Sequence, residues 1–204
     1  MRPAVEAIFP TFTSRLEGRV AWMYLDCKGL VTIGLGCLID PESLARPLPF
    51  RFKGSDKPAD PAAIGEEWHR VKDNQLLAKQ GYKMAGRVTQ LYLTGEGIDQ
   101  LARRRIESFE ATLRKYLPEW DHWPANAQLA TMSMAWAMGA GFVPKFKNWW
   151  TMAKTQNWPG CAKCCGMNAT GNVGLIPRNK ANVALFNAAD TENPDVITLS
   201  ATGL

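Results

Sequence analysis

The spacing of hydrophobic residues changes character along this chain. In the first segment they recur every three or four positions, which predicts a helix that is interrupted at Pro10 and ends at Glu17-Gly18. Between residues 20 and 39, strand-forming residues are separated by the turn signals Lys28-Gly29 and Gly34-Leu35-Gly36. This stretch predicts a small antiparallel hairpin or meander. A further short strand is expected around 46–53.

Helical spacing returns in the remainder of the chain. Residues 40–60 are rich in proline and read as a loop, after which Asp60-Pro61 forms a good helix start. Thr94 is suited to cap a long helix that stops before Pro118. Further helices are expected over 129–138, around 146–153, from 158 and from 177.

These elements predict an α+β fold of the kind that has a small antiparallel β-lobe and a larger, mainly helical lobe. We expect a single domain over 1–204. Its parts would be a β-lobe at about 18–93, a linking helix at about 94–117, a helical lobe at about 118–189 joined by the N-terminal helix, and a frayed tail at 190–204. A cleft between the lobes is the expected place for an extended ligand.

Composition and charge narrow the class of protein. The chain has 204 residues, 46% of them hydrophobic, and its net charge is +5. A positive net charge favours binding to an anionic polymer, but it is also typical of a solvated basic surface that has no particular partner. The densest basic run, Arg103-Arg104-Arg105, lies inside a helical pattern, and we expect it to form the solvent-exposed face of that helix. Nucleic acid is therefore not an expected partner. No apolar run is long enough to span a membrane.

The cysteines and the first residues carry less information. Five cysteines, an odd number, argue against a complete disulfide framework. Cys161, Cys164 and Cys165 superficially suggest zinc, but no second cysteine pair or histidine pair completes four ligands, so neither a metal nor another cofactor is expected. The N-terminus shows no secretory signal, and a target outside the cytoplasm would need another delivery route.

Three polar residues flank the predicted hairpin: Glu17, Asp26 and Thr32. Glycoside hydrolysis uses one carboxyl group as an acid and a second group that stabilises positive charge or activates water. We expect Glu17, at the buried end of a helix, to be the acid, and Asp26, on a polar hairpin, to be the ionised partner. The hydroxyl of Thr32 is suited to hold a water. A helix-ending Glu and a turn Asp are more often structural, so these residues alone are a weak signal.

The order of these residues resembles the catalytic segment of phage-type lysozymes, glycoside hydrolase family 24. That family has a Glu, eight residues, an Asp, five residues and a Thr, and this chain has the same spacing in Glu17-Gly18, Tyr24-Leu25-Asp26 and Thr32-Ile33-Gly34-Leu35-Gly36. The resemblance extends over roughly 12–39 and 91–189, through segments such as Ala135-Trp136-Ala137-Met138-Gly139 and Gly174-Leu175-Ile176-Pro177-Arg178.

The resemblance implies a muramidase that cleaves the β-1,4 bond between N-acetylmuramic acid and N-acetylglucosamine, with inversion. Glu17 would be the general acid, and Asp26 with Thr32 would position and activate water. Leu38, Trp136 and Trp149 would contact the sugar, although core packing is an equal alternative for the two tryptophans. Arg178 would pair with Glu17 or lie on the surface at a helix start.

Some positions depart from the family pattern. Cys37 stands where a His is common, Ala137 replaces a polar residue, and residues 41–90 match poorly. That region would extend the glycan site, recognise a stem peptide or an inhibitor, or be a surface elaboration.

Other readings of the same residues stay open. One is a non-catalytic wall-binding module; another is a lytic transglycosylase or a chitin-cleaving enzyme of lysozyme fold. For a muramidase we expect a monomer that acts on peptidoglycan in the periplasm or cell wall. A phage endolysin would be released through a membrane pore, whereas an antibacterial effector would be injected by a secretion system and inhibited by an immunity protein.

Overall fold

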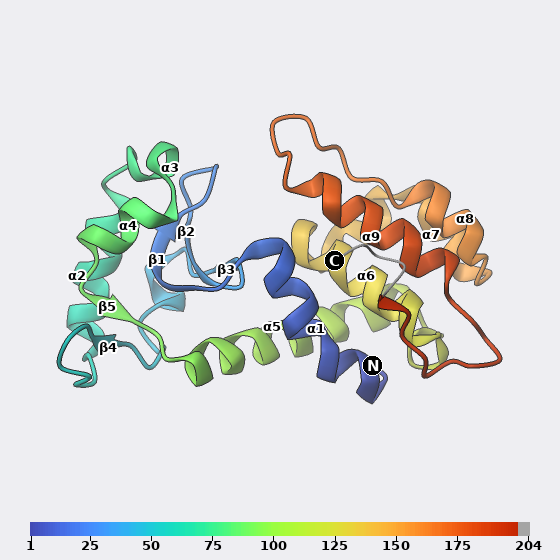
Figure 1. Ribbon diagram of the computed structural model, residues 1–204, viewed down its shortest axis with the longest axis horizontal. Helices are drawn as coiled ribbons and strands as arrows, with labels where there is room; N and C mark the ends of the chain where they lie inside the picture. The colour runs from blue at the N-terminus through green and yellow to red at the C-terminus, as the bar shows by residue number, and fades with distance from the viewer. Residues whose placement is uncertain (200–204) are drawn as a thin grey trace. The chain divides into compact units, whose positions relative to one another are not determined.

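The computed structural model describes residues 1–199 and has a mixed α+β fold with a small antiparallel sheet, as the hydrophobic pattern predicts (Figure 1). It divides into two compact units. Residues Glu17–Arg105 form one, which we call the sheet unit. Met1–Leu16, together with the described chain from Ile106 on, forms the other, the helical unit. The division falls inside two helices, α1 (Pro3–Glu17) and α5 (Gly95–Tyr116).

The sheet unit is built on three short antiparallel strands in the order β1-β2-β3. These are β1 (Val20–Leu25), β2 (Val31–Gly34) and β3 (Cys37–Leu38), so the predicted meander is confirmed. Thr32 on the middle strand lies opposite Tyr24 on one side and Leu38 on the other. Directly opposed residues of an antiparallel pair point to the same face, so these three side chains form a row across the sheet.

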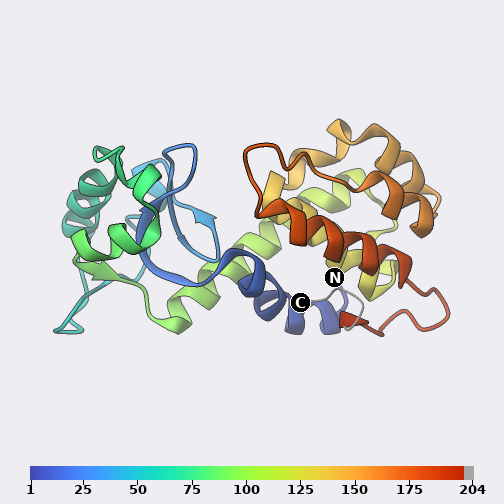
Figure 2. The same cartoon turned by 45° about the horizontal axis from the view of Figure 1, so that its top comes forward.

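Residues 41–90 fold as part of the sheet unit. They contain the 3-10 turn η1 (Glu42–Leu44), the strand β4 (Arg51–Phe52) and the helices α2 (Pro61–Lys72), α3 (Leu77–Gln80) and α4 (Tyr82–Val88). The three helices lie against β1, on the same side of it in Figures 1 and 2. The strand β4 pairs with β5 (Leu91–Tyr92).

Polar side chains fix this region to the rest of the unit. The carboxylate of Glu67 is buried and accepts the backbone N–H groups of Gln90 (2.6 Å) and Leu91 (2.8 Å), which start β5. Asp60 accepts the N–H of Ala63 at 2.8 Å, so the predicted cap of α2 is confirmed. Each bond satisfies a backbone donor that would otherwise lack a partner.

The helical unit packs around α6 (Ala125–Met138), which has apolar residues on every side and is almost wholly buried. Covering it are α9 (Leu175–Asn187) and the 3-10 segment η3 (Ala140–Lys145); α7 (Lys147–Lys154) and α8 (Trp158–Cys164) complete the layer (Figure 2). A short 3-10 turn, η2 (Trp120–His122), precedes α6. None of the described helices is long and apolar enough to cross a membrane.

Two expectations, one about α1 and one about α9, are wrong. Pro10 does not interrupt α1, because a proline removes only one N–H donor and the turns on both sides of it stay helical. The helix α9 begins at Leu175, and Pro177 lies in its first turn, where N–H groups have no intrahelical acceptor.

The predicted tail has no regular helix over 190–198, and its described part makes contacts with the helical unit. Pro194 O accepts the N–H of Ala125 at 2.6 Å, and Thr198 N–H donates to Asn126 Oδ1 at 3.0 Å. Asp195 pairs with Arg2 at 2.7 Å. The part of the predicted tail from 200 to 204 lies outside the described residues.

Candidate functional site

Glu17 is the last residue of α1, and its side chain is exposed rather than buried as expected. The helix ends there at the edge of its apolar face, next to the exposed Gly18 and Arg19. The Glu17 carboxylate nevertheless lies close to the backbone of Gly36, since a Cβ atom at Gly36 would be 3.1 Å from Glu17 Oε2. Gly36, with φ of 75°, closes the turn between β2 and β3. The absence of a side chain at this turn therefore makes room for the Glu17 carboxylate.

Asp26 follows β1 and shapes the turn into β2. Its Oδ1 atom accepts the backbone N–H groups of Lys28 at 2.8 Å and Leu30 at 2.9 Å. Its own N–H donates to Leu30 O at 3.0 Å. Two donors on one oxygen hold the carboxylate in a single orientation. Within the described part of the chain Oδ2 accepts no hydrogen bond, so that oxygen is available to a ligand or a water.

Thr32 lies on the middle strand, β2, six residues after Asp26 in the sequence. Only 4% of the residue is exposed, and its Oγ1 donates to Leu30 O at 3.2 Å. Since that hydrogen is used, the hydroxyl oxygen offers its lone pairs as acceptors. The residue is thus suited to orient a donor such as water.

Tyr24 connects the three positions, and the sequence interpretation gave it no role. Burial raises the pKa of its phenol, and the negative charges of Glu17 and Asp26 raise it further. Tyr24 therefore lies within electrostatic reach of both carboxylates, and it faces Thr32 across the β1–β2 ladder. The structure brings Glu17, Asp26 and Thr32 to one neighbourhood around this ring.

Arg105 and Cys37 lie beside the Gly36 turn, next to the Glu17 carboxylate. Arg105 Nη1 donates to Gly36 O at 2.7 Å, and its guanidinium hydrogen-bonds the side chain of Cys37. Burial raises the pKa of the Cys37 thiol, the Arg105 charge opposes this, and Glu17 adds to it. The expectation that Arg105 lies on a wet helix face is wrong, since it is half-buried. Its position seven residues after the buried Ile98 is the signal that was missed.

The predicted sugar contacts divide between the two units. Leu38, in the sheet unit, lies directly opposite Thr32 and is 44% exposed, so its side chain is accessible to a ligand. In the helical unit, Trp136 is 3% exposed and its ring packs on Phe9 at 5.1 Å. Trp149 is fully buried among aromatic rings. The structure therefore favours core packing for the two tryptophans.

Arg178 is also in the helical unit and is 1% exposed, so the alternative of a surface arginine is wrong. Its Nη1 atom donates to the backbone oxygen of Ser133 at 3.2 Å and to its hydroxyl at 3.0 Å. These bonds tie the start of α9 to α6. The pairing of Arg178 with Glu17 stays a prediction.

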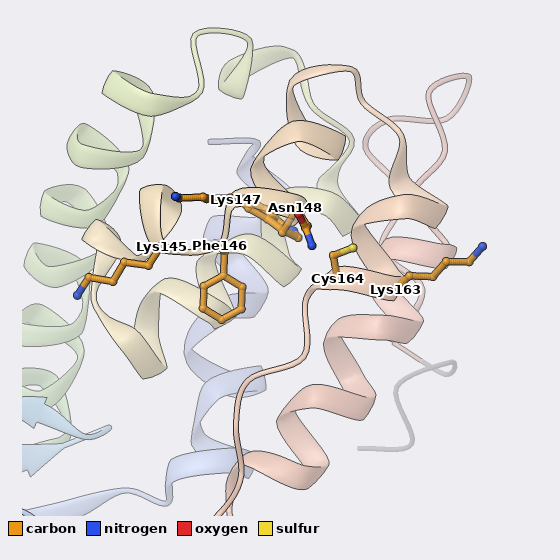
Figure 3. A pocket seen from close by; sticks show the side chains of 7 residues that line it. Lys145, Phe146, Lys147, Asn148, Lys163 and Cys164 are labelled. Atoms are coloured by element: carbon orange, nitrogen blue, oxygen red, sulfur yellow. The ribbon is translucent and has the colours of Figure 1, made fainter.

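A hollow of about 430 Å³ lies in the helical unit at the start of α7 and the end of α8. It is lined by residues that include Lys145, Lys147, Lys163 and Cys164. Figure 3 shows the three amino groups pointing in different directions, so they do not converge on one anion. The residues that line this hollow therefore do not suggest a catalytic or anion-binding site.

All five cysteines are free thiols. Burial raises the pKa of Cys161 to about 12 and that of Cys165 to about 11. Among the described residues, no three of the types His, Cys, Asp and Glu are grouped so as to hold a metal ion. The buried thiols of Cys161 and Cys165 pack as small apolar groups.

Comparison with known proteins adds no assignment: no protein-family model matches the chain, and a search of curated proteins finds no match. The candidate site is therefore defined by its own residues, Glu17, Asp26 and Thr32 with Tyr24, Gly36 and Arg105 around them.

Proposed function

We propose that this protein is a peptidoglycan muramidase of lysozyme-like fold, with Glu17 as the general acid and Asp26 and Thr32 as the water-activating pair. One observation carries the proposal. Both carboxylates act electrostatically on Tyr24, and Tyr24 lies directly opposite Thr32 in the sheet. Two carboxyl groups and a hydroxyl in one place are the groups that hydrolysis of a glycosidic bond needs.

The chemistry assigns one proton transfer to each carboxyl group. Glu17 donates a proton to the leaving glycosidic oxygen as the C1–O bond breaks. Water attacks C1 from the opposite face and gives its proton to Asp26, whose Oδ2 atom is available. Thr32 Oγ1 accepts a hydrogen bond from that water and fixes its approach. This route inverts C1 and requires about 6.5–9.5 Å between the carboxyl groups.

The expected partner is the peptidoglycan strand, whose peptide carboxylates suit a net charge of +5. The reaction uses no cofactor. We further propose a monomer that acts in the periplasm or cell wall, reached through endolysin-type release or through a secretion system, in which case an immunity or inhibitor protein is an additional partner.

Digestion of purified peptidoglycan by the wild type and by Glu17→Gln tests the proposal, with products identified by mass spectrometry. The wild type should release reducing muropeptides. Glu17→Gln should lower the rate by about 10²–10⁴-fold with the fold retained, because it removes the acid and conserves the shape. Glu66→Gln, at an exposed position of α2 in the same unit, is the matched control and should keep wild-type activity.

The products also decide between the alternatives. Wild-type activity in Glu17→Gln contradicts the assignment of the acid. Anhydro-muropeptides, with activity that survives in Asp26→Asn, identify a lytic transglycosylase, which needs no ionised second carboxylate. Binding of peptidoglycan without any product identifies a wall-binding module.

A further inference from the structure

We propose that Tyr82, from the 41–90 region, forms an additional sugar-binding contact beside the Glu17–Asp26–Thr32 site, and that it takes one N-acetylated pyranose ring of a β-1,4-linked glycan. The inference deepens the proposed function and rests on it. It assigns to residues 41–90 the extension of the glycan site, one of the roles left open above.

The first argument is the row of side chains across the sheet. Leu38, Thr32 and Tyr24 lie directly opposite one another on β3, β2 and β1. The ring of Tyr82 continues this row, since its centroid lies 6.4 Å from that of Tyr24 and the two rings meet edge to face at 66°. The row therefore runs past the strand β1 and onto α4. Its two ends, Leu38 and Tyr82, are 44% and 45% exposed.

The second argument is the chemistry of the row. An exposed tyrosine ring offers an apolar face to the C–H groups of a sugar and a hydroxyl to its polar edge. A single exposed aromatic residue is ordinary on a protein surface. Tyr82 differs because the ring it touches, Tyr24, lies within electrostatic reach of Glu17 and Asp26. A glycan bound along the row would pass the carboxyl groups that are proposed to cleave it.

The third argument is that the backbone of α4, which carries Tyr82, is held in place before any ligand binds. Trp22 Nε1 donates to Tyr82 O at 2.7 Å. The indole of Trp22 lies on the backbone of α4, because a Cβ at Gly86 would be 2.6 Å from Trp22 Cε2. Lys53 Nζ donates to Gly86 O at 2.8 Å. A contact that is already ordered loses little conformational entropy on binding.

The test measures binding and turnover separately. Binding of a soluble N-acetylglucosamine hexamer is titrated by calorimetry, with Glu17→Gln as the parent so that the ligand stays intact. Adding Tyr82→Ala should weaken binding about 3–10-fold, in line with one aromatic contact, and Tyr82→Trp should restore it. In the active enzyme, Tyr82→Ala should raise KM on soluble glycan strands by a similar factor, with kcat within twofold.

Leu76→Ala is the matched control. Leu76 is 64% exposed just before α3 and makes no ring contact with Tyr24, so binding and turnover should stay at the parent values. Equal hexamer binding with and without Tyr82 would overturn the inference. So would a fall in melting temperature that accounts for the loss and that Tyr82→Trp does not repair. If the wild type cleaves no peptidoglycan, the muramidase proposal fails while the hexamer titration still decides whether Tyr82 binds sugar.

Discussion

Aromatic residues of the helical unit form a buried cluster, whereas several of those in the sheet unit are only partly covered. In the helical unit they cover one another: Trp123 contacts Trp120, Trp149 and Trp158 at ring distances of 5.0–6.5 Å, and all four are at most 4% exposed. In the sheet unit Trp22, Tyr24 and Tyr82 are only partly covered. The comparison shows that residue type alone does not decide whether an aromatic ring is accessible to a ligand; the groups that cover its faces do.

Three indole N–H groups of the buried cluster differ from those of the sheet unit, although the indole of Trp120 in that cluster donates to Glu110 Oε1 at 3.1 Å. In the sheet unit, Trp22 and Trp68 donate to backbone oxygens at 2.7 and 2.9 Å. In the helical unit, the N–H groups of Trp123, Trp149 and Trp158 are buried and find no hydrogen-bond partner among the described residues. Such a group costs about 1–3 kcal/mol, so the close packing of the rings must outweigh it. These three rings of the helical unit are thus held by packing without a hydrogen bond to their N–H groups, whereas Trp22 and Trp68 of the sheet unit are also fixed by one.

The largest expected effect follows from the buried cluster. Trp149→Ala should lower the free energy of unfolding by about 3–5 kcal/mol, because it opens a large cavity. Urea denaturation followed by far-UV circular dichroism measures it. The control is Trp150→Ala, a half-buried neighbour on the same helix, which should cost clearly less. If Trp149→Ala instead weakens hexamer binding and leaves stability intact, Trp149 is a ligand contact and the contrast between the units breaks.

A smaller effect, on turnover, is expected from a change at Gly36, the glycine next to the Glu17 carboxylate. Gly36→Ala should lower turnover by about 10–100-fold, because the new methyl group displaces the Glu17 carboxylate from its reacting position. Gly54→Ala is the matched control. Gly54 has a similar φ, 80° against 75°, but nothing lies within 4 Å of a Cβ there. Both variants carry the same backbone strain, so equal losses of activity would show that strain, and not the position of Glu17, is responsible.

The smallest effect concerns pH. Burial raises the pKa of Cys161 from 9.0 to about 12 in the folded protein. Below the unfolded value the thiol is neutral in both states, and its contribution to stability is complete. Above about pH 9 only the unfolded chain gains by ionising, so the free energy of unfolding falls as the pH rises towards 12.

Denaturation at pH 8 and pH 10.5 measures this loss. Cys161→Ala should reduce the difference between the two values, whereas Cys27→Ala, at an exposed position in the sheet unit, should leave it unchanged. The opposite ranking would mean that the buried thiols of the helical unit do not stay neutral.

Local patterns were enough to predict the meander, the cap at Asp60 and most of the helices, because each depends on residues close in the sequence. The side chain of Thr94, for example, accepts the N–H of Gly97 at 3.1 Å where the capping pattern predicts a helix start. The separate helices α3 and α4 were not predicted. The exposure of Glu17, the burial of Trp149 and the role of Arg105 depend on contacts with distant residues. The ring contact between Tyr82 and Tyr24 was missed for the same reason, since the two residues are 58 positions apart in the sequence.

The division of the chain has a consequence for how such a protein can change over generations. The sheet unit is one uninterrupted segment, Glu17–Arg105, whereas the helical unit is assembled from the chain before and after it. Glu17, Asp26, Thr32 and Tyr82 are therefore encoded together. Two crossovers, one at the codons of residues 16 and 17 and one at those of residues 105 and 106, would exchange these proposed catalytic and sugar-binding side chains together, while the tryptophan-rich unit would keep its own sequence.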